Sequence, residues 1–282
     1  MAAIGAMIRR DVHPHDLVGH ARAIEALFDE LWIVEDLPYA GGISQAAAVL
    51  ASTATVTVGH GIAPAPFRNP TALAMEWATL AEAFPGRFKA AIGHGVQDWM
   101  RSIGEQVESP LTLLRETTVA VTALLNGGTV NQSGRYTTLD NITLEYPPTR
   151  PPTVALGVSG PRSLELAGEI ASGTVLPEGH GPDEVWDARE RITAGARRAQ
   201  HRGSHHMTVF AGCHIGSTAT MAPRNPAAPV GWEAVGPTPD AVARKLRDLI
   251  DADVDTIVLV PLGQDLEHDM HALGTQVVPQ LR

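Results

Sequence analysis

The chain of 282 residues has little cysteine, no dense cluster of basic residues and no long hydrophobic run. Its single cysteine, Cys213, excludes an internal disulfide and is typical of the reducing cytoplasm, so we expect a cytoplasmic location. The net charge is −10, and without a basic patch we expect no nucleic-acid partner. No apolar run approaches about 18 residues, and the first residues lack the features of a signal peptide, so we expect no membrane partner.

The length and composition fit one large core. The sequence is 44% hydrophobic, which is enough apolar material for a single barrel-type domain. Only residues 146–152 and 219–239 are rich enough in turn-forming residues to act as linkers. Both are flanked by segments that continue one alternation of strands and helices, so we predict a single domain over residues 1–282.

Short apolar or β-branched runs alternate with amphipathic stretches along the chain. The runs predict strands at residues 4–8, 31–34, 55–59, 88–92, 152–157, 173–176, 207–212 and 256–260. Helical patterns lie at residues 16–29, 69–84, 109–125, 160–170, 183–200, 238–250 and 265–281. Eight strands that nearly all alternate with helices predict a (β/α)8 TIM barrel. Residues 129–148 are predicted as a small insertion with a hairpin near Ser133-Gly134, and residues 219–239 as a loop over one mouth of the barrel.

In such a barrel the active site lies at the carboxyl ends of the strands. The third and fourth predicted strands both end in Gly-His-Gly, at 59–61 and 93–95, and glycine there permits unusual torsions or close approach to a ligand. The residues that fall at or just beyond the strand ends are Arg9, Arg10, Glu35, Asp36, His60, Gly61, His94, Gly95, Trp99, Ser159, Gly160, Glu178, His180, Cys213 and His214.

Histidines and carboxylates at one rim are also the ligand types of a metal site. His13-Pro14-His15 is similar to the H-x-H of metal-dependent amidohydrolase barrels, but it lies several residues beyond its strand. No lysine follows the fourth strand as a bridging ligand, and the eighth strand ends at Pro261 without a metal-binding aspartate. We therefore expect no metal, and a metal-dependent hydrolase stays an alternative.

The segment Ser159-Gly160-Pro161-Arg162-Ser163 joins the fifth predicted strand to a helix. The first N–H groups of a helix lack partners within it, and the amino end of the helix dipole is positive, so such a turn suits a phosphate group. Arg162 would add charge-assisted hydrogen bonds. A plain strand-to-helix turn is the alternative interpretation.

Five segments, in order along the chain, carry a resemblance to a known family. They are residues 23–36, 57–70, 84–100, 109–116 and 160–173, for example T-V-G-H-G-I-A-P-A-P-F-R-N-P at 57–70 and G-P-R-S-L-E-L-A-G-E-I-A-S-G at 160–173. On these segments the chain resembles the luciferase-like monooxygenase superfamily. Within it, the chain is similar to the F420-dependent, methylenetetrahydromethanopterin reductase-like branch.

The resemblance implies a barrel with coenzyme F420, a deazaflavin, or alternatively FMN, lying across the strand ends. It implies a non-prolyl cis peptide bond at Gly61-Ile62, and homodimers, which are common in relatives. The cofactor-binding residues that we predict on this basis are Glu35, His60, Gly61, Ile62, His94, Trp99, Ser159, Gly160, Arg162 and Ser163. The expected function is hydride transfer between F420 and a small organic substrate, with an FMN-dependent monooxygenase as the alternative.

Glu35 and Asp36 are the predicted catalytic residues, because the family places polar groups near the ring at the end of the second strand. We expect burial to raise their pKa values, so that one of them hydrogen-bonds the ring or relays a proton. Some relatives have histidine at the position of Asp36, and the glucose-6-phosphate dehydrogenase relatives have an acid at the position of Val96. These departures argue against a histidine mechanism and a sugar-phosphate substrate, and they leave open a coenzyme-binding protein without turnover.

Overall fold

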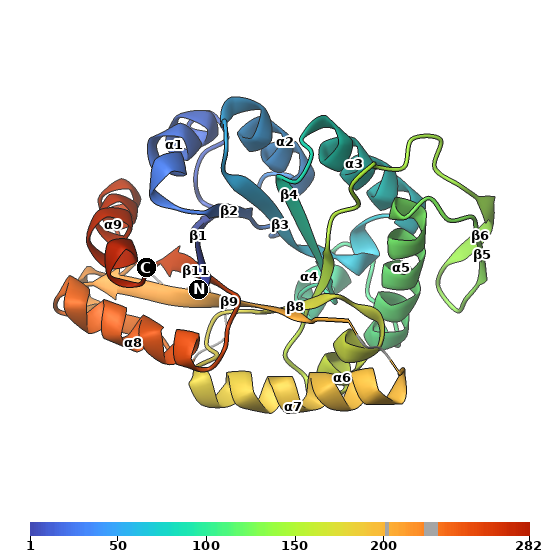
Figure 1. The fold of residues 1–282 in the computed structure, drawn as a ribbon. Helices are drawn as coiled ribbons and strands as arrows, with labels where there is room; N and C mark the ends of the chain where they lie inside the picture. The colour runs from blue at the N-terminus through green and yellow to red at the C-terminus, as the bar shows by residue number, and fades with distance from the viewer. Residues whose placement is uncertain (201–202, 223–230) are drawn as a thin grey trace.

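The computed structural model describes residues 1–200, 203–222 and 231–282, and it shows a closed parallel barrel (Figure 1). Eight strands form the ring, and the last pairs back onto the first. Their order around the ring is β1 (Ala3–Ile8), β2 (Glu30–Ile33), β3 (Thr57–Pro64), β4 (Phe88–Gly93), β7 (Val154–Gly157), β8 (Gly173–Leu176), β9 (His206–Ile215) and β11 (Thr256–Pro261). The predicted TIM barrel is confirmed.

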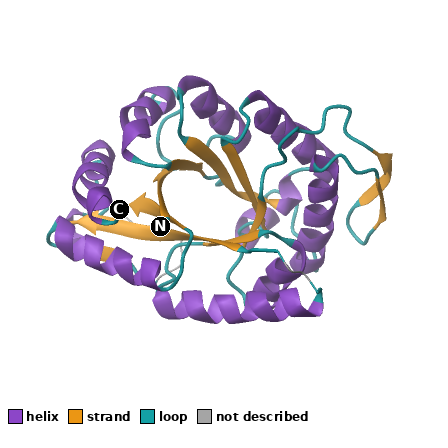
Figure 2. Ribbon diagram, in the orientation of Figure 1, coloured by secondary structure: helices purple, strands orange, loops and turns teal. Residues whose placement is uncertain are grey.

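Helices surround the ring of strands (Figure 2). They are α1 (Leu17–Ile24), α2 (Gly42–Ser52), α3 (Pro70–Ala83), α4 (Gln97–Ser102), α5 (Pro110–Leu125), α6 (Pro161–Ile170), α7 (Pro182–Arg198), α8 (Pro239–Asp251) and α9 (Leu266–Ala272). Proline at the first helical position starts five of them, because its missing N–H would have no partner there in any case. At α3 the Asn69 side chain also accepts a hydrogen bond from the N–H of Thr71, at 2.9 Å.

Two layers of apolar side chains hold the barrel together. The larger layer lies between the strands and the helices, where Leu50, Trp77 and Leu114 are fully buried. The smaller fills the inside of the barrel around Trp32 and Phe210, whose rings meet edge to face with centroids 5.4 Å apart. The barrel is therefore a packed core rather than a pore, and a ligand has to sit at one of its mouths.

The hairpin in the predicted insertion is confirmed, and it is fastened to α5 by one carboxylate. Strands β5 (Val130–Ser133) and β6 (Thr138–Ile142) pair antiparallel. Glu116 on α5 accepts the backbone N–H groups of Arg135, Tyr136 and Thr137 at 2.7, 2.9 and 3.0 Å. The hairpin stands outside the ring of helices (Figure 1).

Several sequence assignments need correction, among them the short helix α4, which was not predicted. The chain forms a helix, α2, between β2 and β3, where no helix was predicted. Its buried residues follow helical spacing and are Gly42, Gln45, Ala46, Val49 and Leu50. The other face is rich in alanine, so the sequence shows little difference in polarity between the two faces and no clear helical period. The predicted loop 219–239 contains strand β10 (Ala234–Gly236), which extends the sheet beside the carboxyl end of β9. The remainder of that prediction falls partly on residues 223–230, outside the described residues.

The closing helix is also shorter than predicted. α9 ends at Ala272 and continues as a π-helical turn, Leu273–Val277, and a 3₁₀ turn, Val278–Gln280. No described helix is long and apolar enough to cross a membrane. Within the described residues, no group of three or more histidine, cysteine or acidic side chains is arranged to hold a metal ion.

Candidate functional site

The carboxyl end of β3 forms part of the floor of the candidate site. The pairing of β3 with β4 shifts register between His60 and Ala63, and the Gly61-Ile62 peptide bond is cis, as predicted. The Ile62 side chain lies over two glycines, one on the adjacent strand β4 and one on β7, the strand after it. A Cβ atom at Gly93 or at Gly157 would lie 2.4 Å from Ile62. These glycines therefore leave the space in which the Ile62 side chain fits, and Ile62, like Val34, packs against the cluster inside the barrel.

Glu35, predicted as a catalytic residue, is held in a buried network beside this floor. Its side chain is 5% exposed, and both of its oxygens accept hydrogen bonds of 2.7 Å from the guanidinium of Arg68. The backbone N–H of Gly42 donates to the same carboxylate at 3.1 Å. His60 Nε2 lies 3.6 Å from it, beyond a normal hydrogen bond.

The expected rise in the pKa of Glu35 is wrong. Burial does act to raise it, but the neighbouring His60 and Arg68 act in the opposite direction and together lower the pKa to about 2. Because the 3.6 Å contact with His60 is long, we assign most of this effect to the bidentate Arg68. A carboxylate that holds its charge so firmly is suited to positioning Arg68 and α2, and poorly suited to carrying a proton at neutral pH.

His60 lies between β3 and the helices α2 and α3 rather than in the mouth. It is fully buried, and its Nδ1 accepts a 3.0 Å hydrogen bond from the indole N–H of Trp77 on α3. Since an indole can only donate, Nδ1 has no proton and the neutral ring has its hydrogen on Nε2, toward Glu35. The structure thus brings the predicted pair Glu35 and His60 together, in a network that links β2, β3 and α3.

Asp36, the second predicted catalytic residue, has a different environment. Its side chain is 25% exposed, and Oδ2 lies 3.0 Å from Arg10 Nη1, at the end of β1. The Arg10 guanidinium in turn stacks over the ring of Tyr39 at 4.7 Å. Burial raises the pKa of Asp36, and Arg10 only partly offsets this. Asp36 is therefore accessible, and its pKa, unlike that of Glu35, is shifted toward the pH range in which a carboxyl group exchanges protons.

The amino end of α6 provides a set of open hydrogen-bond donors. Ser159, Gly160 and Arg162 are exposed, and their N–H groups make no hydrogen bond within the described part of the chain. His94, at the end of β4, lies beside this helix end, with Nε2 2.9 Å from Ser163 Oγ. Four of the predicted cofactor-binding residues thus lie in one turn, and a fifth, His94, contacts that turn.

The remaining predicted residues are more loosely placed. Trp99 is half-buried on α4. Arg9, Arg10 and Arg68 all form ion pairs within the chain, with Asp11, Asp36 and Glu35 respectively.

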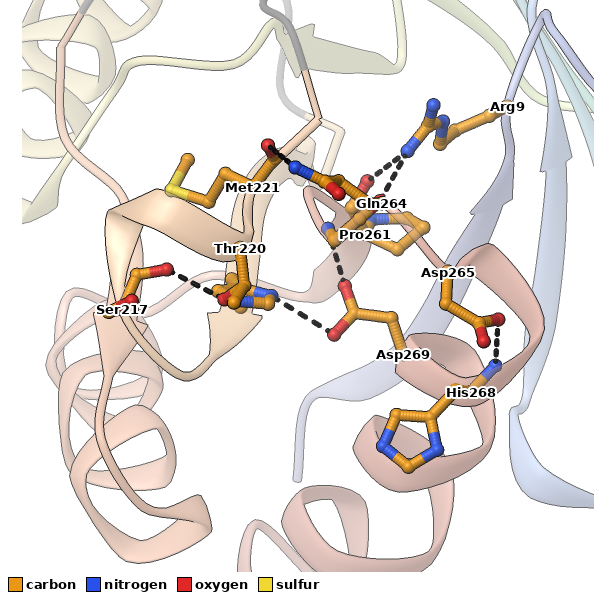
Figure 3. Close-up of polar contacts among 11 residues, drawn as sticks. Arg9, Ser217, Thr220, Met221, Pro261, Gln264, Asp265, His268 and Asp269 are labelled. Carbon is orange, nitrogen blue, oxygen red and sulfur yellow. Dashed lines mark hydrogen bonds and ion pairs between the residues drawn. The ribbon is translucent and has the colours of Figure 1, made fainter.

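A second polar network fixes the loops that follow β9 and β11 (Figure 3). Asp269 on α9 lies 3.1 Å from His214 Nδ1 and accepts the N–H of Gly263 at 2.7 Å. His214 Nε2 lies 2.7 Å from Thr220 Oγ1, and Arg9 donates to the carbonyl of Gly263 at 3.0 Å. Sequence analysis placed His214 at a strand end but missed its partners, which come from elements far along the chain. The network holds two mouth loops together.

A cavity of about 240 Å³ lies at the opposite, amino-terminal end of the strands, lined in part by Trp32, Lys89 and His206. None of the predicted site residues lines it. Lys89 pairs there with the buried Glu30 at 2.5 Å. The predicted residues converge at the carboxyl end, and we place the candidate site there.

Comparison with known proteins agrees with this architecture. The family model for luciferase-like monooxygenases matches residues 1–252. A 5,10-methylenetetrahydromethanopterin reductase from Archaeoglobus fulgidus is 24% identical over 90% of this chain and 92% of its own length. A relative of the same name from Methanolobus tindarius is 28% identical, but the chain covers only 52% of its length. An F420-dependent glucose-6-phosphate dehydrogenase from Nakamurella multipartita is 25% identical over 95% of this chain and 93% of its own length.

Solved structures show the same fold. The coenzyme F420-dependent tetrahydromethanopterin reductase from Methanopyrus kandleri superposes with a TM-score of 0.83, with 20% identity and coverage of 100% and 99% of the two chains. The oxygenating constituent of 3,6-diketocamphane monooxygenase from Pseudomonas putida, in complex with FMN, gives a TM-score of 0.73 at 15% identity over 100% and 99% of the chains.

Proposed function

The chain belongs to the luciferase-like monooxygenase family, and we propose that it is an oxidoreductase that transfers a hydride between coenzyme F420 and a small organic substrate. The observation that carries this proposal is the similarity over at least nine-tenths of the chain to relatives of which one is named as F420-dependent. The family model matches residues 1–252, a range that contains Glu35, Asp36, His94 and the amino end of α6.

The residues at the mouth fit the phosphate of such a coenzyme. The open N–H groups of Ser159, Gly160 and Arg162 point outward at the positive end of a ten-residue helix. A Cβ at Gly160 would meet nothing closer than Ser163 Oγ at 3.9 Å, so the backbone is accessible to a ligand on that side. His94, whose Nε2 lies 2.9 Å from Ser163 Oγ, adds one imidazole ring beside this turn.

Each part of the chain then has a separate task. F420 supplies a ring carbon that accepts or donates the hydride. The α6 turn would hold its phosphate, while Ile62 and Val34 provide an apolar surface at the mouth, which excludes water from the reacting atoms. Asp36 would exchange the substrate's proton, since it is accessible and its pKa is raised. We assign Glu35 the task of fixing Arg68, His60 and α2 around the site.

The alternative is an FMN-dependent monooxygenase, because a protein of the same fold is seen in complex with FMN. Titration of the purified protein with F420 and with FMN, followed by fluorescence quenching, separates the two. The proposal predicts micromolar or tighter binding of F420 and binding of FMN at least tenfold weaker. Tighter binding of FMN would favour the alternative, and binding of neither coenzyme would refute both.

A further inference from the structure

The order of strands places two carboxyl-bearing ends on opposite sides of the barrel mouth. Between β2 and β8 the ring has β3, β4 and β7 on one side and β1, β11 and β9 on the other, so the two strands face each other. Asp36 follows β2, and Glu178 follows β8. Asp36 and Glu178 therefore approach each other across the barrel axis. Val34 and Ile62 pack on the cluster inside the barrel.

The backbone that presents Glu178 is fixed on both sides. His180 Nδ1 lies 2.8 Å from the carbonyl oxygen of Pro177, just before Glu178. Gly179, just after it, has a φ of 89°, a conformation that favours glycine, and its carbonyl accepts the N–H of Trp232 at 3.0 Å. The turn therefore holds Glu178 in place, although the Glu178 side chain has no partner from another described residue.

Electrostatics connect the two sides of the mouth. Glu178 is half-buried, and its partial removal from water is the main cause that raises its pKa; the charge of Asp36 raises it further, while Arg10 acts in the opposite direction. Arg10 is already hydrogen-bonded to Asp36, so its single charge cannot neutralise two carboxylates. Asp36 from the end of β2, Arg10 from the end of β1 and His180 in the same turn are the titratable groups we place around Glu178.

We propose that Glu178 is a further proton-exchanging residue of this site and that it acts together with Asp36 on an uncharged substrate bearing a hydroxyl or carbonyl oxygen. This inference rests on the proposed function, in which the hydride passes between substrate carbon and F420. As the hydride leaves, the substrate O–H bond breaks, its electron pair forms the carbonyl, and the proton moves to one carboxylate. The reverse reaction returns that proton to the oxygen.

The charge around Asp36 and Glu178 selects against an anionic substrate. With both carboxylates ionised, Arg10, Asp36 and Glu178 sum to one negative charge, and one shared proton brings the sum to zero. A phosphorylated substrate would meet a carboxylate that no cation balances, whereas a neutral oxygen hydrogen-bonds to either side.

The electrostatic pairing is testable in the protein without coenzyme. The side-chain carboxyl of Glu178 is followed by NMR in protein labelled with ¹³C-glutamate, and it is assigned by its loss in Glu178→Gln. We expect it to titrate above the ordinary glutamate range and to shift to lower pH in Asp36→Asn. Glu190→Gln, which removes an exposed carboxyl on α7, should leave the titration unchanged. An unchanged titration in Asp36→Asn would overturn the pairing.

The substrate class is tested with F420 bound. Reduction of F420 is followed by absorbance for a panel of neutral alcohols and their phosphate esters. We expect reduction by neutral members, about a hundredfold slower in Glu178→Gln and less impaired in Glu178→Asp, with F420 affinity changed less than twofold in both. Reduction only by phosphate esters, or by no member of the panel, would show the substrate class to be wrong. Failure of the wild type to bind F420 would refute the proposed function instead. The NMR titration needs no coenzyme, so it would still test the electrostatic pairing of Glu178 with Asp36.

Discussion

Glu35 and Asp36 show how two adjacent carboxyl groups acquire opposite properties from their surroundings. Glu35 is 5% exposed and shares a bidentate pair with Arg68, while Asp36 is 25% exposed and has a single contact with Arg10. The pKa of Glu35 is lowered to about 2 and that of Asp36 is raised. The two residues therefore have different roles. Glu35 is a buried, ionised partner of Arg68, whereas Asp36 is exposed to the mouth of the barrel.

Removal of Arg68 should destabilise the protein. Arg68→Met leaves the buried Glu35 carboxylate without its cation, and we expect the free energy of unfolding to fall by about 2–4 kcal/mol, somewhat less than for a fully buried pair because Arg68 is partly exposed. Arg101→Met, which breaks an exposed pair with Asp98, is the control and should change stability by less than about 1 kcal/mol. Urea unfolding measures both, and equal effects would contradict the role of Glu35.

Glu35 should also make stability depend on pH in the acid range. Its pKa falls from 4.5 to about 2 on folding, so its ionised form stabilises the folded state fully above pH 4.5. That stabilisation, about 3 kcal/mol, is lost as the pH decreases from 4.5 to 2. Unfolding free energies measured across this range should decrease, and the slope should be shallower in Glu35→Gln. An identical slope in the variant would show that Glu35 has no such coupling.

At the scale of elements, the floor depends on β3, β4 and β7 leaving room for one side chain. Gly157→Ala would place a Cβ 2.4 Å from the Ile62 side chain. We expect a loss of about 1–3 kcal/mol in unfolding free energy, because the packed floor has to shift. The control is Gly41→Ala, where a Cβ would meet nothing within 4 Å.

The double variant Gly157→Ala/Ile62→Ala checks the cause of that loss. Shortening Ile62 makes room for the added methyl group, so the double variant should lose less stability than the two single variants added together. Additive losses would mean that the cost at Gly157 has another origin.

The amino end of α6 should control coenzyme affinity. Ser159→Asp places a negative charge beside the open N–H groups, and we expect F420 to bind at least tenfold more weakly. Glu145→Asp, a conservative change in the insertion, is the control. Fluorescence titration measures both. Unchanged affinity in Ser159→Asp would place the coenzyme phosphate elsewhere.

At the scale of the whole molecule, the barrel was predictable because the alternation of strands and helices is local information. The strand ends follow from the same alternation, so Glu35, Asp36, His94 and the α6 turn were predicted at the carboxyl ends of the strands. What sequence does not show is pairing between distant segments. Arg68 is 33 residues from Glu35, and only the folded chain places it against that carboxylate.

The misses have similar causes. Helix α2 was overlooked because alanine on its exposed face blurs the periodicity, and β10 was overlooked because a three-residue strand in a proline- and glycine-rich segment has too few residues to show a pattern. Glu178 was seen at a strand end, but its relation to Asp36 depends on the closure of the ring, which brings β2 and β8 face to face.

The most direct test of the account is a crystal structure of the protein with F420. We predict the coenzyme phosphate on the N–H groups that open α6, and the deazaflavin ring at the carboxyl end of the strands, against Ile62 and within reach of Asp36. Coenzyme bound at the amino-terminal end of the barrel, or a mouth closed by the protein's own side chains, would contradict the account.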